Sequence, residues 1–220
     1  DFERTKSNQL NFVEQVIKTS SDEEFSKMAL EDFLFRGTNM QSMTMGTSSG
    51  IKSITVDDVK SHFNKFFTTA NLTIGLAGDY DPILVKNMRQ DLTQMSREEP
   101  PVPAAGAAIS ASGLEIEIIQ KPGALGSAVF TGFPLSVTRK DNDFAALMIA
   151  NSWLGEHRKS YSRLYKKIRE ERSMNYGDYT YIEWYGNGGQ NMLPRPGTPR
   201  SSNYFSIWLR PVQTASGLKK

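Results

Sequence analysis

The sequence predicts an α+β fold, because helical and strand-like patterns of apolar residues both occur along its 220 residues. Apolar residues recur at helical spacing through most of the first half, and short segments in both halves alternate between apolar and polar residues. Between the halves, residues 98–112 are rich in Pro, Ala and Gly and have no periodicity, as expected of an extended linker. We therefore expect residues 1–97 and 113–220 to be parts of two domains.

In the first half, several helices are predicted together with their start signals. Ser21 is followed three residues later by Glu24, and Thr55 by Asp58, which is the spacing of a capping box. Asp81-Pro82 fits an N-cap with proline at the first helical position. The expected elements are helices over residues 4–17, 22–35, 56–67 and 82–95, a loop over 46–50, and a strand over 72–76.

In the second half, strands and helices alternate. Leu114, Ile116 and Ile118 alternate with Glu115 and Glu117, which predicts a half-buried strand. The remaining expected elements are strands over 127–133, 179–182 and 204–209, helices over 141–153 and 160–172, and a loop rich in Gly, Pro and Asn over 186–202.

Composition excludes several kinds of chemistry. With 38% hydrophobic and 23% charged residues, the chain is neither disordered nor fibrous. It has no cysteine, so disulfides, thiolate nucleophiles and Cys-based metal sites are excluded. The formal net charge of +2 requires no polyanionic partner, and no apolar run is long enough to span a membrane.

The sequence contains neither of two short catalytic motifs, the zinc-binding histidine pair and the serine-nucleophile motif. The only histidines, His62 and His157, form neither a His-Glu-x-x-His nor a His-x-x-Glu-His pair, and no Gly-x-Ser-x-Gly occurs. We interpret His62 as a packing or boundary residue. Residues 158–172 contain seven Lys or Arg against two Glu, a pattern that also fits a nucleic-acid contact. We favour a solvated helix face and expect no nucleic-acid partner, since the charge balance elsewhere is ordinary.

Both halves of the chain carry an ordered set of short motifs. The second half carries Asn151, Leu154-Gly155, Ser162-Arg163-Leu164, Arg169-Glu170 and, seven residues after that arginine, Tyr176. The first half carries Gly46-Thr47, Ile51 to Thr55, Asp58-Val59, Asn71 to Ile74 and Ala77 to Asp79. In this order and spacing, the motifs resemble those of the M16 (pitrilysin/insulinase) metallopeptidase family. Two segments depart from the pattern: Ser173-Met174 stands where the family often has Gly-Leu, and Glu156 to Lys159 replaces a Gly-rich turn.

The resemblance implies an M16 peptidase-like (LuxS/MPP-like) fold, in which helices flank antiparallel sheets in two related domains. Residues 1–97 would be the C-terminal part of a first domain, and 113–220 the N-terminal part of a second. In the family, His-x-x-Glu-His and a distant Glu bind zinc, while an Arg and a Tyr of the second domain hold the substrate. This implies that Arg169 and Tyr176 bind substrate, and that Glu14 occupies the third-ligand position.

The implied function is that of a fragment or non-catalytic subunit of a zinc-dependent M16 endopeptidase that acts on peptides or unfolded polypeptides. The chain alone would bind no cofactor and be inactive. Zinc is expected in the complete enzyme or in a partner domain or subunit that carries His-x-x-Glu-His. The alternative is a non-enzymatic assembly or binding protein that kept the M16 fold and lost catalysis. Bacterial relatives of this kind suggest a periplasmic or exported location.

Overall fold

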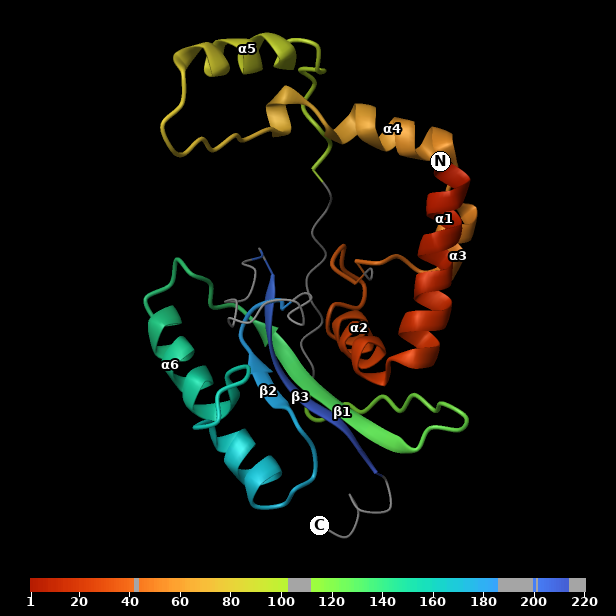
Figure 1. The fold of residues 1–220 in the computed structure, drawn as a ribbon, viewed down its shortest axis with the longest axis vertical. Coiled ribbons are helices and arrows are strands. Elements are labelled where there is room, and N and C mark those ends of the chain that lie inside the picture. The colour runs from red at the N-terminus through yellow and green to blue at the C-terminus, as the bar shows by residue number, and fades with distance from the viewer. Residues whose placement is uncertain (42–43, 103–111, 186–199, 201, 214–220) are drawn as a thin grey trace. The chain divides into compact units, whose positions relative to one another are not determined.

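The computed structural model describes residues 1–41, 44–102, 112–185, 200 and 202–213 (Figure 1). The chain divides into two compact units. The first unit comprises Asp1–Leu10 and Thr47–Ala104, and the second comprises Asn11–Gly46 and Ala105–Lys220. The assignment of residues 1–97 and 113–220 to two domains stays a prediction, and the loop expected over 186–202 lies mostly outside the described residues.

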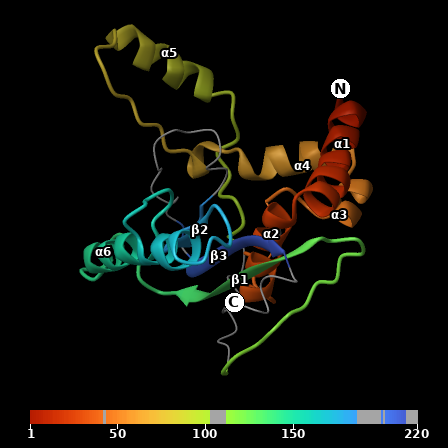
Figure 2. The same cartoon turned by 60° about the horizontal axis from the view of Figure 1, so that its bottom comes forward.

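An antiparallel three-stranded sheet forms the centre of the second unit. Its strands are β1 (Gly126–Leu135), β2 (Asp178–Tyr181) and β3 (Asn203–Gln213), in the order β1-β3-β2. They lie side by side in both views (Figures 1 and 2). Ile207 at the centre of β3 pairs with Thr131 on one side and Thr180 on the other. The three strands predicted over 127–133, 179–182 and 204–209 are thereby confirmed.

Helices cover both faces of this sheet. Helix α2 (Asp22–Leu34) begins at the Ser21 cap and packs on β1 and β3, where Leu30, Leu34, Phe35 and Tyr204 form a buried cluster. Helix α6 (Phe144–Gly155) and the π-helical turn η3 (Tyr165–Glu170) contact β2. Because successive side chains of a strand point to opposite faces, Tyr181 faces the α2 side, with Trp208, and Thr180 faces α6. A further π-helical segment, η1 (Phe12–Ser20), also packs against α2.

The first unit consists of helices joined by extended segments. Its elements are α1 (Phe2–Asn11), α3 (Ser48–Ser53), α4 (Val56–Phe66), the 3-10 turn η2 (Thr69–Asn71) and α5 (Pro82–Leu92). The capping box of Thr55 with Asp58 and the Asp81 N-cap form as predicted. The apolar face of α4 is uncovered by the described residues: Phe63 and Phe67 are 53% and 55% exposed.

Three sequence predictions of local structure are wrong. A loop was expected over 46–50, but helix α3 begins at Ser48. Thr47 caps this helix by accepting a hydrogen bond from the Gly50 amide. The strands expected over 72–76 and 114–118 are extended, but neither belongs to a β-ladder within the described part of the chain. Alternation predicts extended backbone, whereas a strand also needs a neighbour with which to pair.

No helix in the described ranges combines the length and the apolarity that crossing a lipid bilayer requires.

Candidate functional site

Arg169 and Tyr176, which the sequence separates by seven positions, lie next to each other in the structure. The guanidinium carbon of Arg169, in η3, lies 4.7 Å from the ring centroid of Tyr176 and 4.7 Å from that of Tyr165. Both distances are within the range of a cation–π contact. No described carboxylate forms an ion pair with Arg169, and Tyr176 is 77% exposed. The pair therefore combines a half-buried cation with an exposed phenol.

The backbone of η3 and the turn after it brings this pair together. The amide of Glu171 donates to the Lys166 carbonyl, five residues back, and those of Ser173 and Met174 donate to the Arg169 and Ile168 carbonyls. Ser173 has a φ of 50°, in the left-handed region where glycine is favoured. This is the position at which the resembled family often has glycine. The chain therefore makes the turn despite the substitution, at the cost of local backbone strain.

A side-chain brace holds the other end of the turn, next to Tyr176. The Asn175 amide nitrogen donates to Asp178 Oδ1 at 2.7 Å, and Asn175 Oδ1 accepts from the Gly177 amide at 3.2 Å. Asp178 is only 2% exposed, and this burial raises the pKa of its carboxyl group to about 6. Asp178 begins β2, so the brace ties the Tyr176 turn to the sheet.

The Leu154-Gly155 motif permits the end of α6 to approach the sheet closely. A Cβ atom on Gly155 would lie 2.9 Å from Leu164 Cδ1 and 3.1 Å from the Thr180 amide nitrogen. A Cβ atom would push on the Leu164 side chain and on the Thr180 backbone, so this close packing favours glycine. Leu164 belongs to the Ser162-Arg163-Leu164 motif, whose Ser162 is buried. These two motifs thus position the segment that leads into η3.

His157 has a structural role that sequence reasoning missed. Its Nδ1 atom lies 2.6 Å from the Tyr181 hydroxyl, and its ring packs 4.3 Å from the ring of Tyr179. Burial, and next the positive charge of Arg158, lower the pKa of His157 to about 4, so it is neutral at neutral pH. The sequence offered one sign of this role, because polar residues 156–159 stand where the resembled family has a Gly-rich turn.

Glu156 fixes the same turn from its other side. Its Oε2 atom accepts hydrogen bonds from Ser152 at 2.6 Å and from Tyr161 at 3.1 Å. Arg158, with a φ of 59°, takes the conformation that a glycine would adopt without strain. Side-chain bonds from Glu156 and His157 therefore hold a turn whose backbone would otherwise favour glycine.

Glu14 lies on η1, apart from the elements that carry Arg169 and Tyr176. It is half-buried, and its carbonyl accepts a hydrogen bond from Thr19 at 2.7 Å. Among the residues described, no group of three His, Cys, Asp or Glu side chains is placed to hold a metal ion. A catalytic zinc site needs about three protein ligands. This part of the chain does not fit such a site on its own, and no step of hydrolysis is assigned to it.

Comparison with known families decides the classification. The family model described as peptidase M16 inactive domain matches residues 53–197, which is well over half of the chain. The chain belongs to the M16 peptidase family. The matched range includes the Leu-Gly, Ser-Arg-Leu and Arg169 to Tyr176 segments of this M16 protein, and it also spans the predicted linker.

Solved structures support the same fold at low sequence identity. The peptidase M16 inactive domain from Pseudomonas fluorescens is 18% identical, with a TM-score of 0.72, over 99% of this chain and 48% of its own. A protease from Helicobacter pylori is 15% identical with a TM-score of 0.70, over 99% of this chain and 49% of its own. A conserved protein from Enterococcus faecalis V583 is 16% identical with a TM-score of 0.61, over 94% of this chain and 44% of its own.

The extent of these matches confirms the fold class. The predicted M16-like α+β fold is correct, and the chain spans about half the length of the solved structures that it matches. No curated protein sequence matches the chain.

Proposed function

We propose that this M16 chain provides the substrate-holding side of a zinc-dependent endopeptidase cleft and does not hydrolyse peptides by itself. The observation that carries the proposal is the contact between Arg169 and Tyr176, 4.7 Å from guanidinium carbon to ring centroid. A guanidinium donates paired hydrogen bonds to a carbonyl or carboxylate, and a phenol donates one toward a developing oxyanion. The two donors lie next to each other, Arg169 half-buried and Tyr176 exposed, where we expect a peptide to reach both.

Two features of the surroundings favour a binding role over a purely structural one. Arg169 has no carboxylate partner among the described residues, so it is not held in a structural ion pair. It also lies in a π-helical turn, a local geometry that is frequent at functional sites. The zinc and the general base would come from a complementary M16 domain or subunit that carries His-x-x-Glu-His.

The proposal predicts the effect of Arg169→Ala in the complete protein or complex. Loss of a transition-state hydrogen-bond donor should lower kcat/KM for peptide cleavage by about 100-fold. Zinc content should be unchanged, because Arg169 is not a metal ligand. Arg169→Lys should recover part of the activity at most, since an ammonium group cannot form the paired bonds.

Lys166→Ala is the matched control, because it removes an exposed cation from the same turn. It should leave both kinetics and zinc content unchanged. Kinetics of Arg169→Ala equal to those of the unsubstituted protein would remove Arg169 from the site.

The second candidate is a non-enzymatic M16-fold assembly or binding protein. It is favoured by the matching family model, which describes an inactive domain. The complete coding sequence discriminates between the two candidates. An intact His-x-x-Glu-His elsewhere in the protein or its partner supports the peptidase, and a degenerate equivalent supports the scaffold.

A further inference from the structure

The side chain of Asn175, directly before Tyr176, forms hydrogen bonds with three parts of the second unit. Its Oδ1 atom accepts from the Gly177 amide at 3.2 Å. Its Nδ2 atom donates to Asp178 Oδ1 at 2.7 Å and to the Arg210 carbonyl at 3.4 Å. Because Asp178 begins β2 and Arg210 lies in β3, this one carboxamide ties the Tyr176 turn to two strands of the sheet.

The bond from the Gly177 amide closes an Asx turn, and Tyr176 is the residue inside it. In such a turn a side-chain oxygen takes the place of a backbone carbonyl, so it holds the backbone of the residue that it spans. Gly177 also packs closely on Tyr179, since a Cβ atom at this position would lie 2.7 Å from the Tyr179 hydroxyl. The backbone on both sides of Tyr176 is therefore held in place.

Asp178 is the buried anchor of this turn. Within the described residues Asn175 is the only hydrogen-bond donor to its carboxyl group, whose Oδ2 atom is buried without a partner. The charged and titratable groups that act on it are Arg210, which is ion-paired with Glu23, and the phenol of Tyr179. Loss of the bond from Asn175 would leave this buried carboxyl group unsatisfied, which is unfavourable. Asn175 and Asp178 therefore hold each other in place.

The side chain of Tyr176 depends on this backbone for its direction. It is 77% exposed, and its ring centroid lies 4.7 Å from the guanidinium carbon of Arg169. A cation–π contact at such an exposed ring is weak. The accuracy with which the phenol is placed therefore comes from the turn that carries it.

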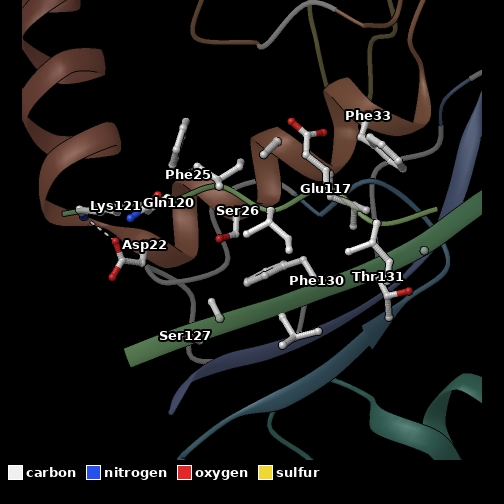
Figure 3. A pocket seen from close by; sticks show the side chains of 18 of the residues that line it. Asp22, Phe25, Ser26, Phe33, Glu117, Gln120, Lys121, Ser127, Phe130 and Thr131 are labelled. Carbon is white, nitrogen blue, oxygen red and sulfur yellow. Dashed lines mark hydrogen bonds and ion pairs between the residues drawn. The ribbon is translucent and has the colours of Figure 1, made fainter. Parts of the chain in front are cut away.

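The contacts of this turn are separate from the hollow that the second unit contains between α2, residues 114–121 and β1 (Figure 3). That hollow has a volume of about 710 Å³, and no residue of the turn 173–178 lines it. The polar contacts of Asn175 and Asp178 therefore belong to the Tyr176 turn and to the strands β2 and β3.

We propose that Asn175 is a positioning residue, which directs the Tyr176 phenol toward the substrate by closing the Asx turn and tying it to Asp178. The inference rests on the function proposed above, in which this phenol donates a hydrogen bond toward the developing oxyanion. Such a donor acts only when it is placed accurately, and a displacement of about 1 Å can lower the rate by about 100-fold. Asn175 acts through Tyr176 and has no contact with the substrate.

Kinetics of the complete protein or complex test this role. Asn175→Ala should lower kcat for peptide cleavage by about tenfold or more with little change in KM, because the phenol acts in the transition state. Tyr176→Phe should lower kcat by about 100-fold. The double variant N175A/Y176F should have the kcat of Tyr176→Phe alone, because Asn175 acts through the hydroxyl that is already missing.

A purely structural role of Asn175 would give a different result. The double variant would then lose a further factor equal to the effect of Asn175→Ala alone, and that outcome would overturn the proposal. The matched control is Asn142→Ala, at an exposed asparagine of the same unit, which should leave kcat and KM unchanged.

Asn175→Asp provides a second test, which also serves if Asn175→Ala does not fold. The new carboxyl group can still accept from the Gly177 amide, but it replaces the donor that lies 2.7 Å from Asp178 Oδ1. Burial already raises the pKa of Asp178 to about 6, and two adjoining carboxyl groups share a proton at low pH and repel each other once both are ionised. Relative to the unsubstituted protein, kcat of this variant should be nearly unchanged at about pH 5.5 and about tenfold lower at about pH 8. A ratio that does not change with pH would contradict the proposal.

Failure of this inference can be told apart from failure of the proposed function. If Tyr176→Phe leaves kcat unchanged, the phenol has no role and both proposals are wrong. If Tyr176→Phe lowers kcat while Asn175→Ala and Asn175→Asp match the unsubstituted protein at every pH, the proposed function stands and the positioning role of Asn175 is wrong.

Discussion

The half-buried His157 and the buried Asp178 have pKa shifts with opposite effects on the pH dependence of stability. Burial lowers the pKa of His157 from 6.5 to about 4, so between these values the unfolded chain binds more protons and stability rises with pH. Burial raises the pKa of Asp178 from 3.8 to about 6, so in that window the native chain binds more protons and stability falls as pH rises. The two effects oppose each other between about pH 4 and pH 6.

Urea unfolding of single variants should separate the two effects. In His157→Phe the Asp178 effect is no longer offset by His157, so from pH 4 to pH 6.5 the free energy of unfolding should fall relative to that of the unsubstituted chain. In Asp178→Asn, whose amide oxygen still accepts from Asn175, it should rise over the same range relative to the unsubstituted chain. Slopes equal to that of the unsubstituted chain in both variants would contradict the two pKa shifts.

At the scale of the element, Ser173 after η3 and Arg158 after α6 have positive φ, and they lie where the resembled family often has glycine and has a Gly-rich turn, respectively. Ser173→Gly and Arg158→Gly should each raise the free energy of unfolding by about 1 kcal/mol, because glycine removes the strain of the left-handed conformation. Thermal or urea unfolding measures this. Ser160→Gly, at a neighbouring turn residue without positive φ, should give no gain. A loss of stability in both glycine variants would mean that the side chains of Ser173 and Arg158 stabilise the fold by more than the relief of backbone strain does.

Elements were predictable where their signals are local. The Thr55 capping box and the Asp81-Pro82 start are written in three or four consecutive residues, and the helices begin where these residues predict. The segments Leu72 to Leu76 and Leu114 to Ile118 were wrongly predicted as strands, since pairing depends on residues distant in sequence. A shared substrate-binding role of Arg169 and Tyr176 was implied by family resemblance alone, and no periodicity predicts their contact.

The missed features of the site are also non-local. His157 is a polar residue after a helix, and only the approach of Tyr179 and Tyr181 from β2 makes it a half-buried, neutral anchor. The need for Gly155 likewise arises from Thr180, 25 positions later in the sequence. Such constraints appear only when the sheet is assembled.

At the scale of the whole molecule, our proposal gives this M16 chain a substrate-binding role and places zinc in another M16 domain. The described residues include the half-buried Arg169 beside the exposed Tyr176, and no group of three side chains that could hold a metal ion. The absence of catalysis by the chain alone stays a prediction. With two histidines and no cysteine in the sequence, the proposal has zinc ligated by residues from another M16 domain.

The most direct test is a paired measurement on the purified 220-residue chain: its zinc content after equilibration with the metal, and its cleavage of an unfolded polypeptide with and without chelator. Our account predicts substoichiometric zinc and no chelator-sensitive cleavage. Stoichiometric zinc together with cleavage that the chelator abolishes would contradict it.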